Sequence, residues 1–305
     1  MKSKHAMQLP FAWIFASIIG AFILFLSIYI GIKFIGIGET EIEYKISEKI
    51  GILLGPLETG FETSNKHDIE TPVDTRIYSE CEDSGTFGKQ KIRASQLVSK
   101  KWTDANASVS FPNRYIFSRN YSEGKKFFVF AKQFEMPFKV ADLVYLSSSR
   151  ENYCFTNAPK NIEDELKTLG QENIATSNCS SDSIKVCFAH GSSCDIEVEY
   201  SQKVVVKGSD RLYFEGDALM YAAIFSEKNQ YECQVKRLMK RLGQLSLLYR
   251  DKATLISKKD CQSNLELGLL SMAANNVQDS KSLSIVGKIS EDINKNNEIA
   301  YCKLW

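Results

Sequence analysis

The sequence is poor in histidine and proline and carries almost no net charge. Its 305 residues include three histidines and six prolines, and 38 basic side chains balance 37 acidic ones to a formal net charge of +1. A nucleic-acid-binding protein usually presents a clear excess of Lys and Arg. The charge balance therefore argues against a nucleic-acid partner, and we expect none.

Catalytic and cofactor motifs are missing as well. The chain contains no G-x-S-x-G, no H-E-x-x-H, no EF-hand loop and no Rossmann glycine pattern. The stretch from Asp83 to Gln90, DSGTFGKQ, resembles a phosphate-binding loop only loosely, because the first glycine is misplaced and no Ser or Thr follows the lysine. We interpret it as a surface turn. The sequence therefore predicts no enzyme, no catalytic residue and no cofactor.

The most prominent feature that is present is a long apolar stretch near the start. From Ala6 to Ile32 no side chain is charged, and this run exceeds the roughly 20 residues that a helix needs to cross a bilayer. A cleaved signal has a shorter apolar region of about 7–15 residues. We therefore expect an uncleaved transmembrane helix over 9–37, with membrane lipid as its partner.

The eight cysteines all follow this stretch, at positions 81, 154, 179, 187, 194, 233, 261 and 302. An even number on one side of the membrane predicts disulfide bonds in an oxidising compartment. Lys2 and Lys4 precede the apolar stretch, which places the N-terminus inside and the rest of the chain extracytoplasmic. Three N-x-S/T sequons, candidates for glycosylation, start at Asn106, Asn120 and Asn178.

Two disulfides can be proposed from the local pattern. Cys187 and Cys194 flank a short polar turn, so we expect them to pair across a β-hairpin. Cys261 and Cys302 would meet if the last two helices form a helical hairpin. An alternative is a zinc site made of Cys179, Cys187, His190 and Cys194. Its spacing lacks the C-x2–4-C pairs that structural zinc sites use, and extracytoplasmic thiolates tend to oxidise.

Periodicity divides the chain into a β-rich part and a helical part. Lys125–Phe134 is apolar on both faces, as in a buried strand, and residues 196–200 alternate as in a half-buried strand. A short helix is expected with Asn161 as its N-cap. Apolar residues recur at helical spacing from Tyr231 to Tyr249, and further helices fit 261–277 and 283–295.

These patterns predict an α+β fold stapled by disulfides. The expected parts are a short cytoplasmic N-terminus (1–8), the transmembrane helix (9–37), a helical stalk and connector (38–64), a β-rich extracytoplasmic domain (65–215) and a helical C-terminal part (216–305).

Two surfaces suggest contacts with partners. Small residues recur every fourth position in the apolar stretch, at Ala12, Ala16 and Gly20, and such a face allows close helix–helix packing. The long helix carries a basic face opposite its apolar stripe, made of Lys236, Arg237, Lys240 and Arg241. We interpret this face as solvated, with an acidic partner or an anionic lipid surface as the alternative.

The first 35 or so residues resemble archaeal type IV pilin-like and other signal-anchor proteins, on the basis of a few basic residues, Gln8 and the long apolar helix. The stretch 221–249, YAAIFSEKNQYECQVKRLMKRLGQLSLLY, is similar to a group of uncharacterised archaeal membrane-anchored proteins. The resemblance implies no activity and no site residues.

From all of this we expect a single-pass membrane-anchored extracytoplasmic protein of the cell surface with a structural or interaction role, pilus- or envelope-associated, whose partners are other membrane or cell-surface proteins. One alternative is a receptor or solute-binding ectodomain that acts with a membrane partner. Another is a tethered extracytoplasmic enzyme of unrecognised type.

Overall fold

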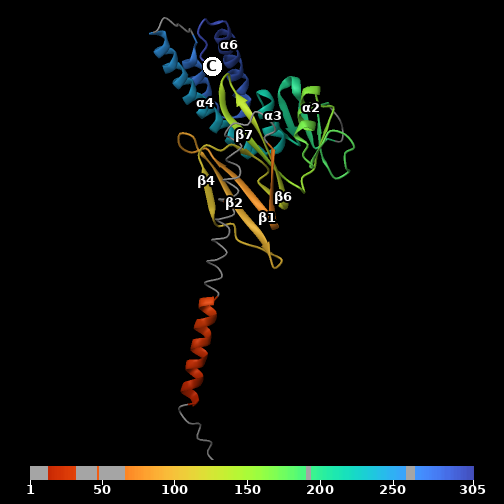
Figure 1. The fold of residues 1–305 in the computed structure, drawn as a ribbon, viewed down its shortest axis with the longest axis vertical. Helices are drawn as coiled ribbons and strands as arrows, with labels where there is room; N and C mark the ends of the chain where they lie inside the picture. Colours follow the sequence, from red (N-terminus) through yellow and green to blue (C-terminus); the bar gives the residue numbers. More distant parts are fainter. Residues whose placement is uncertain (1–12, 32–46, 48–65, 190–193, 259–264) are drawn as a thin grey trace, which may run out of the picture.

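The computed structural model describes residues 13–31, 47, 66–189, 194–258 and 265–305. An apolar helix runs from Trp13 to Gly31, with a mean hydropathy of 2.4 and none of its surface buried against the rest of the chain (Figure 1). It is long and apolar enough to cross a membrane. The predicted stalk over 38–64 lies outside the described residues, apart from Ser47.

The folded part after residue 65 contains two sheets. The first has seven strands in the order β3-β2-β1-β6-β7-β5, with β4 beside β2, and every pair is antiparallel except β5 and β7. Its strands are β1 (Lys66–Glu82), β2 (Lys89–Val98), β3 (Lys101–Trp102), β4 (Ser108–Phe111), β5 (Ile116–Phe117), β6 (Tyr121–Glu135) and β7 (Lys139–Ser148).

The second sheet has six short strands in the order β13-β12-β11-β10-β8-β9, parallel from β9 to β11 and antiparallel from β11 to β13. Its strands are β8 (Tyr153–Thr156), β9 (Ile174–Ala175), β10 (Ile184–Cys187), β11 (Ile196–Glu199), β12 (Val204–Lys207) and β13 (Asp210–Tyr213). The helices are α2 (Lys160–Leu169), α3 (Gly216–Phe225), α4 (Lys228–Ser257), α5 (Leu267–Asn275) and α6 (Leu283–Ile299).

The core is organised around α3, which is apolar on all sides. Every residue from Ala218 to Phe225 is buried, as expected of a helix enclosed by other elements. It contacts β6 and β7 of the first sheet and β12 and β13 of the second (Figure 1). The Tyr145 hydroxyl donates a 2.7 Å hydrogen bond to the Ala218 carbonyl, which satisfies a buried group at the start of this helix. Because α3 contacts both sheets, residues of the two sheets share one hydrophobic core around it.

The first sheet is buried on both faces. Along β6, Phe127 and Val129 belong to a smaller cluster, whereas Phe130 and Phe134 point into the main core. Successive strand residues point to opposite faces, so this alternation confirms the prediction of a strand that is apolar on both sides. The predicted α+β class with late helices is likewise confirmed.

Two local predictions are wrong. Helix α2 has Pro159 rather than Asn161 as its N-cap residue, because the Glu163 amide already donates to the Pro159 carbonyl at 2.9 Å. Strands β10 and β11 do not form a hairpin. They run parallel, with Val186 opposite Ile196, and the Asp195 amide and carboxylate both bond the backbone of Lys185. After β10 the chain therefore runs back, so that Asp195, just before β11, lies beside Lys185 near the start of β10.

The basic face of the long helix is not solvated either. Arg237 is completely buried, and Lys240 donates to the carbonyls of Asp83 and Gly85. These carbonyls belong to the β1–β2 turn, the stretch that loosely resembles a phosphate-binding loop. Figure 1 shows this end of the first sheet beside α4. Arg237 and Lys240 therefore bind the protein's own backbone, because the turn that packs against the helix offers its carbonyl groups as acceptors.

Candidate functional site

A cleft lies beside the start of β6, the β7–β8 turn and the end of α3. It has two chambers that share Arg119 and Glu227. The first, of about 470 Å³, is lined mainly by polar side chains and is called the polar chamber: it is walled by Asn120, Tyr121, Glu123, Ser148, Arg150 and Glu151. The second, of about 280 Å³, is called the apolar chamber after five of its residues, Tyr153, Ile184, Ile196, Ile224 and Phe225; Asp195, Lys207 and Gly208 also line it.

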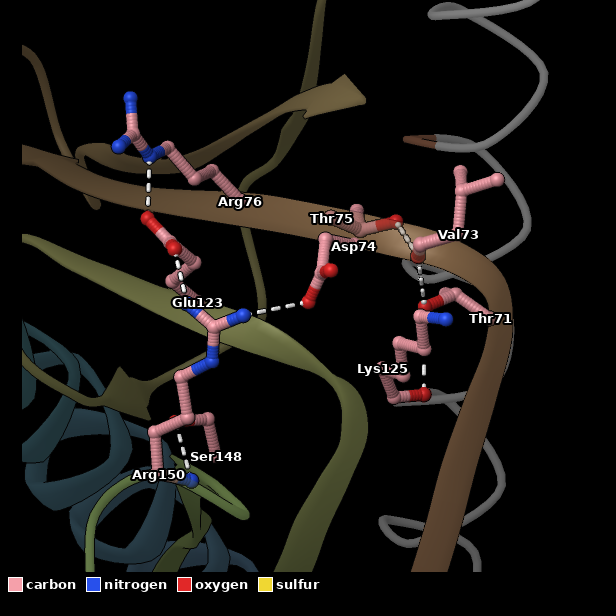
Figure 2. Close-up of polar contacts among 9 residues, drawn as sticks. All are labelled: Thr71, Val73, Asp74, Thr75, Arg76, Glu123, Lys125, Ser148 and Arg150. Atoms are coloured by element: carbon pink, nitrogen blue, oxygen red, sulfur yellow. Dashed lines mark hydrogen bonds and ion pairs between the residues drawn. The ribbon is translucent and has the colours of Figure 1, made fainter. Parts of the chain in front are cut away.

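Two residues that line the polar chamber, Glu123 and Arg150, belong to a chain of alternating charges. Glu123 lies between two arginines: it accepts from Arg76 Nε at 2.6 Å and also pairs with Arg150. Arg150 in turn reaches Asp74 Oδ1 at 2.7 Å, as Figure 2 shows. The guanidinium of Arg76 also stacks on the ring of Trp102, 3.9 Å from its centroid. Because each charge has a partner of opposite sign, this chain of charges is held in one arrangement.

An irregularity in β1 places Asp74 in this chain. Pairing of β1 with β6 shifts register between Glu70 and Thr75, so that the strand bulges. The hydroxyl groups of Thr71 and Thr75 both donate to the Val73 carbonyl, at 2.9 and 3.0 Å, and hold the bulge (Figure 2). A bulge re-aims side chains that a regular strand would direct elsewhere.

Glu151 is the most deeply buried carboxyl of the cleft, with 8% of its surface exposed. Its Oε2 atom accepts from the Ser148 amide at 3.3 Å and the Ser122 hydroxyl at 3.5 Å. Within the described part of the chain, Oε1 has no hydrogen-bond partner. Burial raises the pKa of Glu151, and the nearby guanidinium of Arg119 offsets this only in part.

Lys207 lies at the C-terminal end of α3, on the edge of the apolar chamber. Its Nζ donates to the carbonyls of Ile224 and Ser226, at 2.6 and 2.7 Å. Positive charge is favourable at a helix C-terminus, but burial lowers the pKa of Lys207 to about 8. An ammonium has three donors, and these two carbonyls accept two of them.

Replacing Glu151 should change how stability depends on pH. The pKa of this carboxyl is higher in the folded than in the unfolded chain, so its contribution to stability is present below the unfolded pKa of about 4.3 and is lost as the pH rises through the folded pKa. We expect Glu151→Gln to gain stability over the wild type as the pH is raised from 4 to 7. Urea unfolding at several pH values measures this, with the exposed Glu291→Gln as control, and a difference that does not change with pH would contradict it.

The cysteine pairs are largely local to each sheet. Cys187 is joined to Cys194 and Cys154 to Cys179, whereas Cys81 on β1 is joined to Cys233 on α4. The Cys187–Cys194 pair is the one expected from the sequence, although the strands on either side of it, β10 and β11, run parallel and do not form a hairpin. These bonds overturn the alternative zinc site, since Cys179, Cys187 and Cys194 all lie in disulfides.

The second predicted pair is only half described. Cys302 is disulfide-bonded, and Cys261 lies outside the described residues. Within the described segments, no group of three or more His, Cys, Asp or Glu side chains is arranged to hold a metal ion.

The other residues singled out from the sequence do not meet at the cleft, with one exception. The sequon residues Asn106, Asn120 and Asn178 are all exposed, and Asn120 forms part of the polar chamber. Ala16 and Gly20 lie exposed on the N-terminal helix, and nothing lies within 4 Å of the position that a Cβ on Gly20 would take. Ala12 lies outside the described residues.

A second surface of interest covers the C-terminal helices. Large apolar side chains are exposed on α4, α5 and α6 and just after α6, and these residues are together called the helical surface: Leu248, Leu255, Leu269, Met272, Ile285, Ile299 and Tyr301. Between residues 66 and 247, the only exposed large hydrophobic residues among those described are Phe87, Val98, Tyr121 and Tyr200. The exposed apolar side chains are thus concentrated on the last quarter of the chain.

No family model, curated protein or solved structure matches this chain. The resemblance to pilin-like and archaeal membrane-anchored proteins therefore stays a prediction.

Sequence reasoning did not find the cleft. Glu151 and Arg150 belong to a polar turn, SSSREN, between β7 and β8, and Arg119 precedes β6 in another short connection. Neither position follows a periodic pattern or a motif. The available signal was the pair of adjacent charges inside an otherwise serine-rich turn, and it does not distinguish a cleft from a solvated loop.

Proposed function

We propose that the protein is a single-pass membrane-anchored interaction protein of the cell surface, with its N-terminus inside and its disulfide-stapled domain outside. The apolar Trp13–Gly31 helix supports the anchor, and three disulfides within the described residues support an oxidising compartment. The helical surface carries the interaction role. Its partner is another membrane or cell-surface protein, in keeping with pilus or envelope association.

The exposure of the helical surface is the central observation. Met272 and Leu248 are exposed to 65% and 64%, and Ile299 to 84%. Isolated exposed apolar residues are ordinary, but a concentration of them on one part of a folded domain marks an interaction site. Buried apolar side chains at the centre of an interface supply most of its affinity. A partner that covers this surface would therefore bury apolar side chains that are exposed to water in the isolated chain.

The test is the size of the protein in its native membrane. We expect the wild-type chain, of 34.5 kDa, to migrate on a native gel in a larger assembly, and Leu248→Glu combined with Met272→Glu to release it. Lys295→Glu, an exposed change on α6, is the control. Release by Gly20→Leu alone would instead assign assembly to the membrane helix. A wild type that migrates alone, or an assembly that tolerates both glutamates, would contradict the proposal.

A second candidate function is ligand binding outside the cell, together with a membrane partner. The cleft supports it, since binding sites are concave and combine apolar walls with a few well-placed polar groups. The two chambers have this composition. The two functions depend on different surfaces and can be tested apart.

A further inference from the structure

We propose that the cleft binds a free α-amino acid with an apolar side chain, its carboxylate at Arg119, its ammonium group at Glu227 and its side chain in the apolar chamber. The inference deepens the ligand-binding candidate and is independent of the helical surface.

The charges at the junction of the chambers suit a zwitterion. Arg119 Nε lies 3.5 Å from Glu227 Oε1, and both side chains are about half exposed. In the residues that the structure describes, the two terminal nitrogens of Arg119 and the Oε2 atom of Glu227 have no partner. A guanidinium offers its donors to a carboxylate in a fork, and a carboxylate accepts from an ammonium group. A ligand that carries an ammonium group and a carboxylate on one carbon atom could contact both Arg119 and Glu227 without separating these two side chains.

The polar chamber provides a further group at this junction. Glu151 is more than nine-tenths buried, lines the chamber and keeps one oxygen atom without a described partner. That oxygen atom can form a hydrogen bond with a ligand in the chamber. Because its pKa is raised, Glu151 holds its proton at higher pH than an exposed carboxyl. In the protonated form it can donate a hydrogen bond to the ligand carboxylate.

The apolar chamber sets the side-chain preference. The apolar part of its lining comes from Tyr153, Ile196, Ile224 and Phe225, which are buried, and from Ile184, which is half-buried. The chamber's volume of about 280 Å³ has room for a branched or aromatic side chain. Burial of such a side chain away from water is favourable. A ligand with the same charges and no side chain would forgo this contribution.

Calorimetric titration of the full-length chain in detergent tests the proposal. We expect L-leucine or L-phenylalanine to bind, and L-leucinamide, N-acetyl-L-leucine and glycine each to bind at least tenfold more weakly. Leucinamide lacks the carboxylate, acetyl-leucine lacks the ammonium group, and glycine lacks the side chain. Equal binding of leucine and leucinamide would indicate the N-terminus of a peptide and overturn the proposal. So would the absence of any heat at millimolar amino acid.

Variants locate the site. Arg119→Gln and Glu227→Gln should each weaken leucine binding at least tenfold, or about 1.4 kcal/mol, while Glu291→Gln and Lys295→Gln, which break an exposed pair on α6, should not. Should a cleft variant fail to fold, Ile184→Phe, at a half-buried position of the apolar chamber, replaces it and should block leucine more than glycine. Unchanged affinity in these variants would place binding elsewhere. None of these outcomes bears on the native-gel test of the helical surface.

Discussion

Removing the Cys81–Cys233 disulfide should lower the free energy of unfolding by about 5 kcal/mol, and removing the Cys187–Cys194 disulfide by only about 2 kcal/mol. The first bond joins residues 152 positions apart and the second joins residues 7 positions apart. A cross-link stabilises mainly by restricting the unfolded chain, and the restriction grows with the logarithm of the loop it closes. The two bonds therefore differ in effect although both join atoms at similar distances, with Cα–Cα separations of 6.0 and 5.9 Å.

The location of the Cys81–Cys233 bond adds to its importance. Cys81 lies near the end of β1, just before the turn that contacts α4, and Cys233 lies in the first turns of α4. The bond is thus the covalent link between the first sheet and the C-terminal helices. Without it, the unfolded chain is no longer restricted by a closed loop that spans about half of the residues.

Paired Cys→Ser variants and urea unfolding measure the two effects. The Cys187→Ser/Cys194→Ser variant serves as the matched control for the Cys81→Ser/Cys233→Ser variant, because each removes one bond and adds two hydroxyl groups. Equal losses in the two variants, or a larger loss in the short-loop variant, would contradict the chain-entropy argument.

The sequence predicted those elements whose signal is local. The apolar helix follows from a long uncharged run, β6 from an apolar stretch with two buried faces, and α4 from a repeat that places Tyr231, Val235 and Leu238 in the core. In each case the signal is a pattern of apolar residues within a single element. The Cys187–Cys194 pair was predictable because its signal is also local, since only seven positions separate its members.

The contacts that were missed are those between distant segments. Strand β10 pairs in parallel with β11 on one side and with β8 on the other, and no local pattern reports either pairing. The buried position of Arg237 depends on the β1–β2 turn, about 150 residues earlier in the chain. The cleft combines residues from β6, the β7–β8 turn and the end of α3. Such sites arise from tertiary arrangement, and a single sequence holds no signal for it.

Arg237 should be the most sensitive side chain of α4, because it is fully buried without a carboxylate partner among the described residues. Its Nε donates to the Phe87 carbonyl at 3.0 Å. Its terminal nitrogens donate to the carbonyls of Arg114 and Pro112, at 2.8 and 2.9 Å, and to Gln234 Oε1 at 2.6 Å. Burial lowers the pKa of Arg237 to about 10, which leaves the group charged at neutral pH.

The approach of the turn to this guanidinium is close. A Cβ on Gly88, whose φ is +60°, would lie 2.3 Å from the Glu82 carbonyl oxygen and 3.0 Å from Arg237 Cγ. The neighbouring Gln234 extends the contact by donating to Ile116 O at 3.1 Å and to Gln90. The arginine therefore lies at the centre of a polar interface that closes only when the turn, the loop before β5 and α4 are all in place.

We expect Arg237→Met to destabilise the fold by about 3–5 kcal/mol, because it leaves the acceptors of Phe87, Arg114 and Pro112 buried without donors. Arg237→Lys should recover little of this, since one ammonium group cannot reach acceptors that a planar guanidinium reaches on two sides. Arg250→Met, on the exposed side of the same helix, should change stability by less than about 0.5 kcal/mol. Unfolding in urea measures the stability of all three variants. If Arg237→Lys were as stable as the wild type, α4 would need only a positive charge at this position. The hydrogen-bond geometry of the guanidinium would then not be what holds the helix to the sheet.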